Sequence, residues 1–361
     1  MARSVHARRV QALQKSMSKG GVAALVIHTP VNVSYYSGFA SSYCFLVILP
    51  KAAFVVTDGR YMESARELEG FEAVGIQQGG QPVEIGRLLR DAKVKKAGFE
   101  PEITQGTWAM LAGICEGIEL VAAPGLITGP RALKADVEIE AIEASQSLNE
   151  KIFLEALQLL SQHELGTVTE RQFAGLLKIL MLDHDVEPSF EPIVACGLNG
   201  MHPHHRPGAT PIDKGLILID MGIKLKDYCS DMTRMVHLGK PVQKIAKLHE
   251  AVRQAKNAAI AAMKPGIVAK DVHAIAVAEL EKSKLAKLFI HGLGHGVGME
   301  IHEGPRLNGT SEAVLEPGQV VTVEPGIYDP KWGGIRIEDM VVVTADGTRN
   351  LTSLSDDLLV L

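Results

Sequence analysis

The sequence has no long apolar run and no paired cysteines. No stretch approaches the roughly 20 residues of a membrane-spanning helix, and the first residues enter an amphipathic pattern without a signal-like apolar segment. The cysteines are widely separated and form no Cys-x-x-Cys pair of the kind used in zinc and redox sites: Cys44, Cys115, Cys196 and Cys229. These features predict a reduced, cytoplasmic protein.

The chain also lacks a dominant charge of one sign. It has 37 Lys and Arg against 42 Asp and Glu, a net charge of −5, and both signs are scattered along the sequence. Without a basic stripe or a polybasic anchor, neither nucleic acid nor a membrane is expected as a partner. The length of 361 residues, with 46% hydrophobic and 22% charged residues, is typical of a globular protein with two domains.

Residues 1–125 predict a smaller α/β domain. Strand-like segments at 22–27, 44–49 and 53–57 alternate with helical stretches near 8–19 and 60–68. Pro, Gly and small residues between Ala123 and Pro130, followed by a charged run, mark a boundary, and we place the linker at residues 126–134. The second domain is then residues 135–361.

Four helices are expected in this second domain. One spans about 136–162, and another opens at Thr167-Val-Thr-Glu170, which has the pattern of a capping box. Two more follow, at about 242–263, where Lys264-Pro-Gly ends the helix, and at 269–283.

Each pair of helices is followed by a hairpin that carries two acids. Gly-Leu-Ile-Leu-Ile-Asp-Met-Gly and Tyr-Cys-Ser-Asp-Met-Thr-Arg flank a turn near Leu225, which would set Asp220 opposite Asp231. Val-Val-Thr-Val-Glu-Pro-Gly and Gly-Ile-Arg-Ile-Glu-Asp repeat the pattern, and a hairpin centred on Lys331 would set Glu324 opposite Glu338. The recurrence suggests two similar halves that close over a central site.

Four carboxylates in one half-buried place would repel each other unless cations neutralised them. The glycine-rich segment from Phe289 to His302 adds imidazoles, and its glycines at 292, 294, 296 and 298 disfavour a helix. In an extended segment, His291, Leu293 and His295 would share one face, and the glycines would permit close backbone approach. Carboxylates with an imidazole favour Mn²⁺, Co²⁺, Fe²⁺ or Zn²⁺. Five residues therefore fit a pair of water-activating divalent metals: Asp220, Asp231, His295, Glu324 and Glu338.

These motifs resemble the pita-bread metallopeptidases, which include Xaa-Pro aminopeptidases, prolidases, methionine aminopeptidases and the metal-free creatinases. The resemblance rests on His-Gly-Leu-Gly-His-Gly-Val-Gly, Ile-His-Glu-Gly-Pro, Val-Glu-Pro-Gly, Arg-Ile-Glu-Asp and the spacing of the two aspartates. Asn32-Val-Ser-Tyr-Tyr-Ser-Gly and Thr57-Asp-Gly-Arg-Tyr look like the N-terminal domain of the proline-specific members and the creatinases. The resemblance implies an α+β fold in which a pita-bread catalytic domain follows a smaller α/β creatinase/prolidase-type domain.

Carried over by position, the resemblance makes Asp220 a ligand of one metal and Asp231 and Glu338 bridging ligands, with His295 and Glu324 on the other metal. It implies two divalent ions, with Mn²⁺ expected and Co²⁺ or Zn²⁺ as alternatives. Catalytic roles are expected for four residues: His204, His291, His302 and Glu324.

Glu324 is expected to carry a proton from the metal-bridging water to the leaving nitrogen, or else to act as a ligand only. His302 would donate a hydrogen bond to the oxyanion, and His204 would act next to the metal ligands. The alternative for both histidines is that they only orient a carboxylate. Arg306 and Arg336 could bind a substrate carboxylate, although Arg336 could instead neutralise the acidic cluster. His205 departs from the family, which usually has glycine there, and Met201-His202 is also uncommon.

The expected reaction is hydrolysis of the Xaa-Pro bond in short proline-containing peptides. The residues leave open whether the chain is an Xaa-Pro aminopeptidase or an Xaa-Pro dipeptidase. Alternatives are a methionine aminopeptidase-like hydrolase, which the N-terminal domain disfavours, and a non-catalytic peptide-binding module on the same fold, which the complete ligand set disfavours. The resemblance further implies a homodimer in which the N-terminal domain of one subunit shields the cleft of its partner.

Overall fold

The computed structural model describes residues 4–77 and 80–361. It divides into two compact units, Met1–Pro130 and Arg131–Leu361. The division lies within a 3₁₀ turn, Gly129–Ala132, which follows the short helix α6 (Pro124–Ile127). None of the helices formed by the described residues has both the length and the apolarity required to cross a bilayer.

The N-terminal unit is built on a six-stranded mixed sheet of order β4-β3-β2-β1-β5-β6. The central strand β1 pairs antiparallel with β2 and parallel with β5, and its residues are all buried. The predicted strands and helices are present within a few residues. The strands are β1 (Ala24–Ile27), β2 (Cys44–Leu49), β3 (Ala52–Thr57), β4 (Glu72–Gly75), β5 (Lys96–Phe99) and β6 (Glu119–Ala122), and the helices are α1 (Val5–Met17), α2 (Pro30–Ser37), α3 (Met62–Arg66), α4 (Val83–Asp91) and α5 (Gln105–Ile114).

The second unit contains all four predicted helices: α7 (Asp136–Leu160), α8 (Glu170–Asp183), α9 (Gln243–Ala262) and α10 (Ala269–Lys282). The capping box of α8 was predicted two residues too early. Thr169 is the N-cap, and its partner is Gln172. Thr167 instead donates to the Glu164 carbonyl, and the Glu170 side chain is fully buried.

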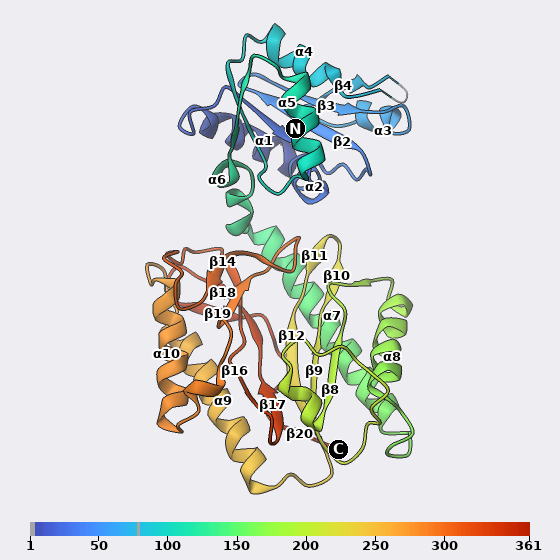
Figure 1. Cartoon of the computed structure of the whole chain (residues 1–361), viewed down its shortest axis with the longest axis vertical. Coiled ribbons are helices and arrows are strands. Elements are labelled where there is room, and N and C mark those ends of the chain that lie inside the picture. The colour runs from blue at the N-terminus through green and yellow to red at the C-terminus, as the bar shows by residue number, and fades with distance from the viewer. Residues whose placement is uncertain (1–3, 78–79) are drawn as a thin grey trace. The chain divides into compact units, whose positions relative to one another are not determined.

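The strands of this unit form two groups, each covered by one helix pair (Figure 1). One apolar core packs β8, β9 and β12 against α7 and α8, and a second packs β14 to β18, together with other residues of β8, β9 and β12, against α9 and α10. The first group comprises β7 (Glu187–Pro188), β8 (Ile193–Cys196), β9 (Gly215–Met221), β10 (Ile223–Leu225), β11 (Tyr228–Cys229), β12 (Met232–Leu238) and β20 (Leu359–Val360). The second comprises β13 (Gly294–Gly296), β14 (Glu303–Leu307), β15 (Val320–Val323), β16 (Gly326–Asp329), β17 (Gly333–Arg336), β18 (Asp339–Val343) and β19 (Thr348–Asn350).

The first acidic hairpin has a different register from the predicted one. Leu225 pairs with Tyr228, so the turn is Lys226-Asp227, and both residues have positive φ angles of 48° and 70°. Two consecutive positive φ angles match the two-residue turn that suits hairpin twist. Asp220 consequently lies opposite Thr233 and not opposite Asp231. Side chains two positions apart still point to one face, so both aspartates remain on the same side of the hairpin.

The second acidic hairpin has the predicted register. Val323 pairs with Asp339 on one side and Gly326 with Arg336 on the other, which leaves Glu324 opposite Glu338. Close backbone approach at the glycine-rich segment is also confirmed, because a Cβ at Gly294 would collide with the Thr322 carbonyl. The predicted common face of this segment was wrong in part. Leu293 is fully buried in the apolar core, away from the cavity that the neighbouring histidines line.

Candidate metal centre

A cavity of about 650 Å³ lies between the two halves of the second unit. Its size suits a small ligand rather than a folded chain. Every candidate site residue predicted from the sequence lines this cavity: His204, Asp220, Asp231, His291, His295, His302, Arg306, Glu324, Arg336 and Glu338. The structure therefore brings together residues from both hairpins, the glycine-rich segment and two loops.

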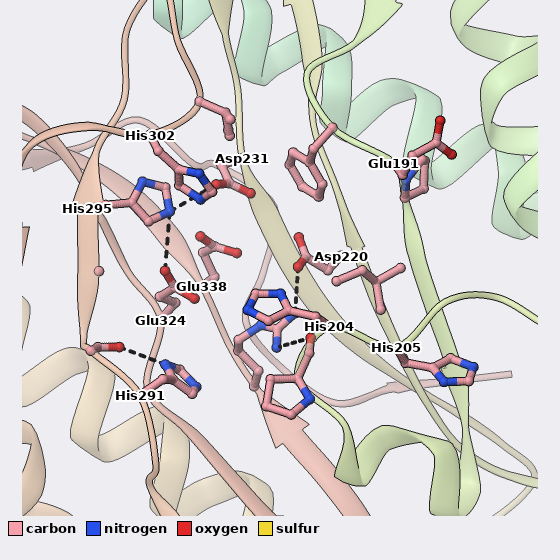
Figure 2. A pocket seen from close by; sticks show the side chains of 18 of the residues that line it. Glu191, His204, His205, Asp220, Asp231, His291, His295, His302, Glu324 and Glu338 are labelled. Carbon is pink, nitrogen blue, oxygen red and sulfur yellow. Dashed lines mark hydrogen bonds and ion pairs between the residues drawn. The ribbon is translucent and has the colours of Figure 1, made fainter. Parts of the chain in front are cut away.

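Three of the predicted ligands form a compact donor cluster. Asp231, His295 and Glu338 each offer one ligand atom, and these atoms lie within 4.8 Å of one another. The His295 Nε2 atom is 3.6 Å from Asp231 Oδ2 and 3.4 Å from Glu324 Oε1. Figure 2 shows Glu324 beside this cluster, with Asp220 across the cavity. The three donors span a distance that one cation could bridge.

His295 is held in the form that a metal ligand requires. Its Nδ1 atom donates to the Gly296 carbonyl at 3.1 Å, which leaves the Nε2 lone pair directed at the carboxylates. Burial lowers the pKa of His295 to about 4, so the imidazole is neutral at neutral pH. Thr322 supports the same edge, because its hydroxyl accepts the His295 backbone N–H and donates to Glu324.

The carboxyl groups carry the electrostatic signature of a cation site. Burial, followed by repulsion from the other acids, raises the pKa of Asp231 and of Glu338 well above their ordinary values. Burial also raises the pKa of Asp220, against the opposing effect of Arg336, and raises that of Glu324 to about 7. Among the described residues, Asp220 Oδ1 and Glu338 Oε1 are buried without a hydrogen-bond partner. Orphaned oxygens beside a neutral imidazole fit a divalent cation with mixed nitrogen and oxygen ligation.

Arg336 is almost fully engaged by the protein. Its Nη2 atom donates to Asp220 Oδ2 at 2.5 Å, its Nε atom donates to Thr233, and its Nη1 atom donates to the Pro203 carbonyl and to the Tyr328 hydroxyl. Its side chain is buried. This geometry favours neutralisation of the acidic cluster over binding of a substrate carboxylate.

Thr233 and Tyr328 are residues that the sequence analysis missed. Thr233 donates to Glu338 Oε2 at 2.7 Å while it accepts from Arg336. Tyr328 lies 2.9 Å from His291 Nε2, and His291 Nδ1 donates to the Gly292 carbonyl. Strand alternation was the available signal for Thr233, because it lies two positions from Asp231 and shares its face.

The remaining candidates lie around the centre. The His302 ring packs edge-on against the His295 ring, with 4.4 Å between centroids, and His204 is exposed on the opposite wall. Arg306 lies opposite His295 in the β13–β14 register, and its side chain is exposed in the cavity. His205, in contrast, points away from the acidic cluster (Figure 2) and bonds to Glu170.

Comparison with known families agrees with this architecture. Residues 140–345 match metallopeptidase family M24, and residues 9–133 match the creatinase/prolidase N-terminal domain. These matches confirm the predicted fold class: a pita-bread catalytic domain preceded by a creatinase/prolidase-type domain.

Individual relatives cover nearly the whole chain. An Xaa-Pro dipeptidase from Pyrococcus furiosus is 33% identical over 97% of this chain and 99% of its own length. The structure of an Xaa-Pro dipeptidase from Bacillus anthracis superposes with a TM-score of 0.91 at 29% identity, covering 99% of this chain and 100% of that one. An X-Pro aminopeptidase from Thermotoga maritima gives a TM-score of 0.87 at 29% identity, covering 94% and 98%. With the matched catalytic domain and the donor cluster in its cavity, this chain belongs to metallopeptidase family M24.

Proposed function

We propose that the protein is a metal-dependent exopeptidase that hydrolyses the Xaa-Pro bond of short peptides. The observation that carries the proposal is the convergence of Asp231, His295 and Glu338, with ligand atoms within 4.8 Å of one another, in a cavity of small-ligand size. The relatives named as Xaa-Pro dipeptidase and X-Pro aminopeptidase support the choice of the bond before proline.

Two divalent ions would be held by five side chains: Asp220, Asp231, His295, Glu324 and Glu338. Asp231, His295 and Glu338 would form the core of this set, because their ligand atoms lie within 4.8 Å of one another. When bound, the ions supply a Lewis acid that polarises the scissile carbonyl and activates water. Mn²⁺ is our first choice, with Co²⁺ or Zn²⁺ also suited to these ligands.

The protein's own groups would then move the protons. Glu324 takes a proton from the attacking water as its oxygen bonds to the carbonyl carbon, and gives that proton to the proline nitrogen as the C–N bond breaks. His302, which packs against His295 at the cavity wall, donates to the oxygen on which negative charge develops. His204 and His291 border the substrate, and Tyr328 orients His291. Arg336 neutralises Asp220 through its short ion pair.

Within this class, the dipeptidase activity has a specific structural argument. Arg306 is an exposed guanidinium in the cavity, opposite His295 in register, and no ion pair engages it among the described residues. A free proline carboxylate next to the scissile bond would complement this charge. We therefore propose an Xaa-Pro dipeptidase, with the aminopeptidase as the second candidate.

Two further properties are part of the proposal. The protein is a homodimer in the cytoplasm, and its substrates are short proline-containing peptides. Sedimentation at micromolar concentration tests the dimer, since a fully active monomer would contradict it.

The decisive experiment measures metal content together with activity on a panel of Xaa-Pro, Xaa-Pro-Yaa and Met-Ala-Ser peptides. The metal-stripped protein should be inactive and should regain Xaa-Pro hydrolysis with Mn²⁺ or Co²⁺. Glu324→Gln keeps the size of the side chain but removes the carboxylate that would carry the proton, and this variant should be inactive. Full activity after metal removal would refute the mechanism, and preferred cleavage of Met-Ala-Ser would identify a methionine aminopeptidase.

A further inference from the structure

Glu170, the first residue of α8, is a fully buried carboxylate outside the metal centre. It accepts four hydrogen bonds from one loop: Cys196 N at 2.7 Å and Asn199 Nδ2 at 2.8 Å on Oε1, and His205 Nε2 at 2.8 Å and Gly208 N at 3.1 Å on Oε2. Burial alone would raise the pKa of Glu170, but these bonds hold it below its ordinary value, so the group stays ionised. One side chain thus ties both ends of residues 196–208, which we call the mouth loop.

The opposite side of the mouth loop packs against the second acidic hairpin, backbone to backbone. A Cβ at Gly334 would collide with the Gly200 carbonyl, and a Cβ at Gly333 would collide with the Gly197 carbonyl. Strand β17, which carries these two glycines, ends at Arg336. The mouth loop is therefore clamped between Glu170 of the first half and the β17 glycines of the second half.

The mouth loop carries groups that face the reaction centre. His204 lines the cavity, and the Pro203 carbonyl accepts a hydrogen bond from Arg336 Nη1 at 3.2 Å, while the same guanidinium binds Asp220. The next residue, His205, lies at the edge of the same cavity, on the side away from the acidic cluster (Figure 2), and its Nε2 atom donates to Glu170. Two adjacent histidines thus have different partners: His205 anchors the loop to Glu170, whereas His204 is exposed in the cavity.

We propose that Glu170 and His205 are positioning residues that hold the mouth loop so that His204 and the Pro203 carbonyl lie correctly against substrate and Arg336. The His205 imidazole supplies one of the four hydrogen bonds by which Glu170 holds the loop. The functional consequence rests on the proposed peptidase activity. The structural consequence, a loop held by one carboxylate, does not.

Three variants of the full-length protein test this proposal. Glu170→Gln keeps the size of the side chain but replaces one acceptor oxygen with an NH₂ group. In either orientation of the amide, this group faces N–H donors and cannot accept their hydrogen bonds. His205→Ala removes one anchor, and His205→Gln keeps a donor at similar reach. Asp183→Asn is the matched control, because it makes the same carboxylate-to-amide change at an exposed position of the same helix.

Hydrogen exchange of the peptide covering 196–208 is the readout independent of activity. It should accelerate in Glu170→Gln and His205→Ala but not in His205→Gln or Asp183→Asn. Exchange in β9 and the bound metal content should stay at wild-type values. Wild-type exchange of the mouth loop in both Glu170→Gln and His205→Ala would overturn the anchor. If Glu170→Gln fails to fold, the two His205 variants decide alone.

Kinetics on Xaa-Pro peptides then test positioning. Glu170→Gln should lower kcat/KM by about 10- to 100-fold, the scale expected when a group at the reacting bond is displaced by about 1 Å. His205→Ala should lose less, and His205→Gln should recover near wild-type activity. Faster loop exchange with unchanged kcat/KM would refute the positioning role. If the wild-type protein hydrolyses no peptide in the panel, the proposed function fails, while the exchange data still judge the anchor.

Discussion

Replacing Arg306 by Met would separate recognition of the substrate carboxylate from the hydrolytic chemistry. Arg306 lies opposite His295 on β14, is exposed in the cavity, and is not a member of the donor cluster. Met keeps much of the apolar stem and removes the charge. The change should therefore leave metal binding intact and weaken only substrates that present a free carboxylate near the scissile bond.

The expected size follows from the position of the guanidinium. Two unit charges about 4 Å apart at an effective dielectric constant of about 20 attract by about 4 kcal/mol, and desolvation of both groups offsets part of this. Hydrogen bonds to charged groups contribute about 1.5–3 kcal/mol net. At about 1.4 kcal/mol per factor of ten, kcat/KM for an Xaa-Pro dipeptide should fall about 10- to 100-fold.

The assay compares the dipeptide with its C-terminal amide, in both wild type and Arg306→Met. Arg306 also lowers the pKa of His295 and of Glu324 through its charge, in each case as a smaller effect than burial, and this contribution acts on both substrates alike. The ratio of the two substrates therefore isolates the carboxylate contact. Arg206→Met, at another exposed arginine of the cavity wall, is the control and should leave the ratio unchanged.

An equal fall for dipeptide and amide would refute carboxylate recognition by Arg306. It would leave Arg306 as an electrostatic neighbour of the centre and would favour the aminopeptidase. A selective fall for the dipeptide would support the dipeptidase.

Three other outcomes are expected. Asp231→Asn and Glu338→Gln should lose both metal and activity, measured by elemental analysis and peptide hydrolysis, because each replaces an anionic ligand with a weak neutral one; unchanged stoichiometry would contradict their placement. His302→Ala should keep its metal yet lower kcat and kcat/KM together by about 10²- to 10³-fold, whereas a rise in KM alone would mark a pocket wall. Burial lowers the pKa of His249 from 6.5 to about 4. The contribution of His249 to the free energy of unfolding is therefore complete above pH 6.5. It is lost as the pH falls from 6.5 toward 4, because the unfolded chain then binds a proton that the folded protein does not. His249→Phe should therefore lose about 2 kcal/mol less stability than wild type between pH 7.5 and pH 5. Urea unfolding followed by Trp332 fluorescence in a Trp108→Phe background measures this, and parallel pH profiles would refute it.

Much of the fold could be predicted because its signals are local. Apolar periodicity located the helices of both units, and β-rich runs located the two hairpins that carry the four carboxylates. The second hairpin was predicted in the correct register because Asp-Pro-Lys-Trp-Gly-Gly marks a turn clearly. The first hairpin was displaced because its turn, Lys226-Asp227, uses positive φ angles at residues that are not glycine.

The donor types were also evident from the sequence, since carboxylates at strand ends and histidines among glycines are features of the chain itself. What the sequence determined was therefore the set of groups available and the elements that carry them. Which of these groups the protein itself engages, and which remain exposed in the cavity, was decided only by tertiary structure. Arg306 and Arg336 were both candidates for binding a substrate carboxylate, but folding surrounded Arg336 with Asp220, Thr233 and Tyr328 and left Arg306 exposed in the cavity.

The same reason explains Glu170 and His205. Nothing near either residue in the chain indicates the other, because the contact depends on how α8 packs against a loop that begins 26 residues later. Periodicity and turn chemistry act over a few neighbouring residues, whereas burial, pKa and hydrogen-bond partners depend on residues that are distant in the chain. Local patterns thus determined which chemistry this protein can carry, and packing determined which side chains face the substrate and which hold them in place.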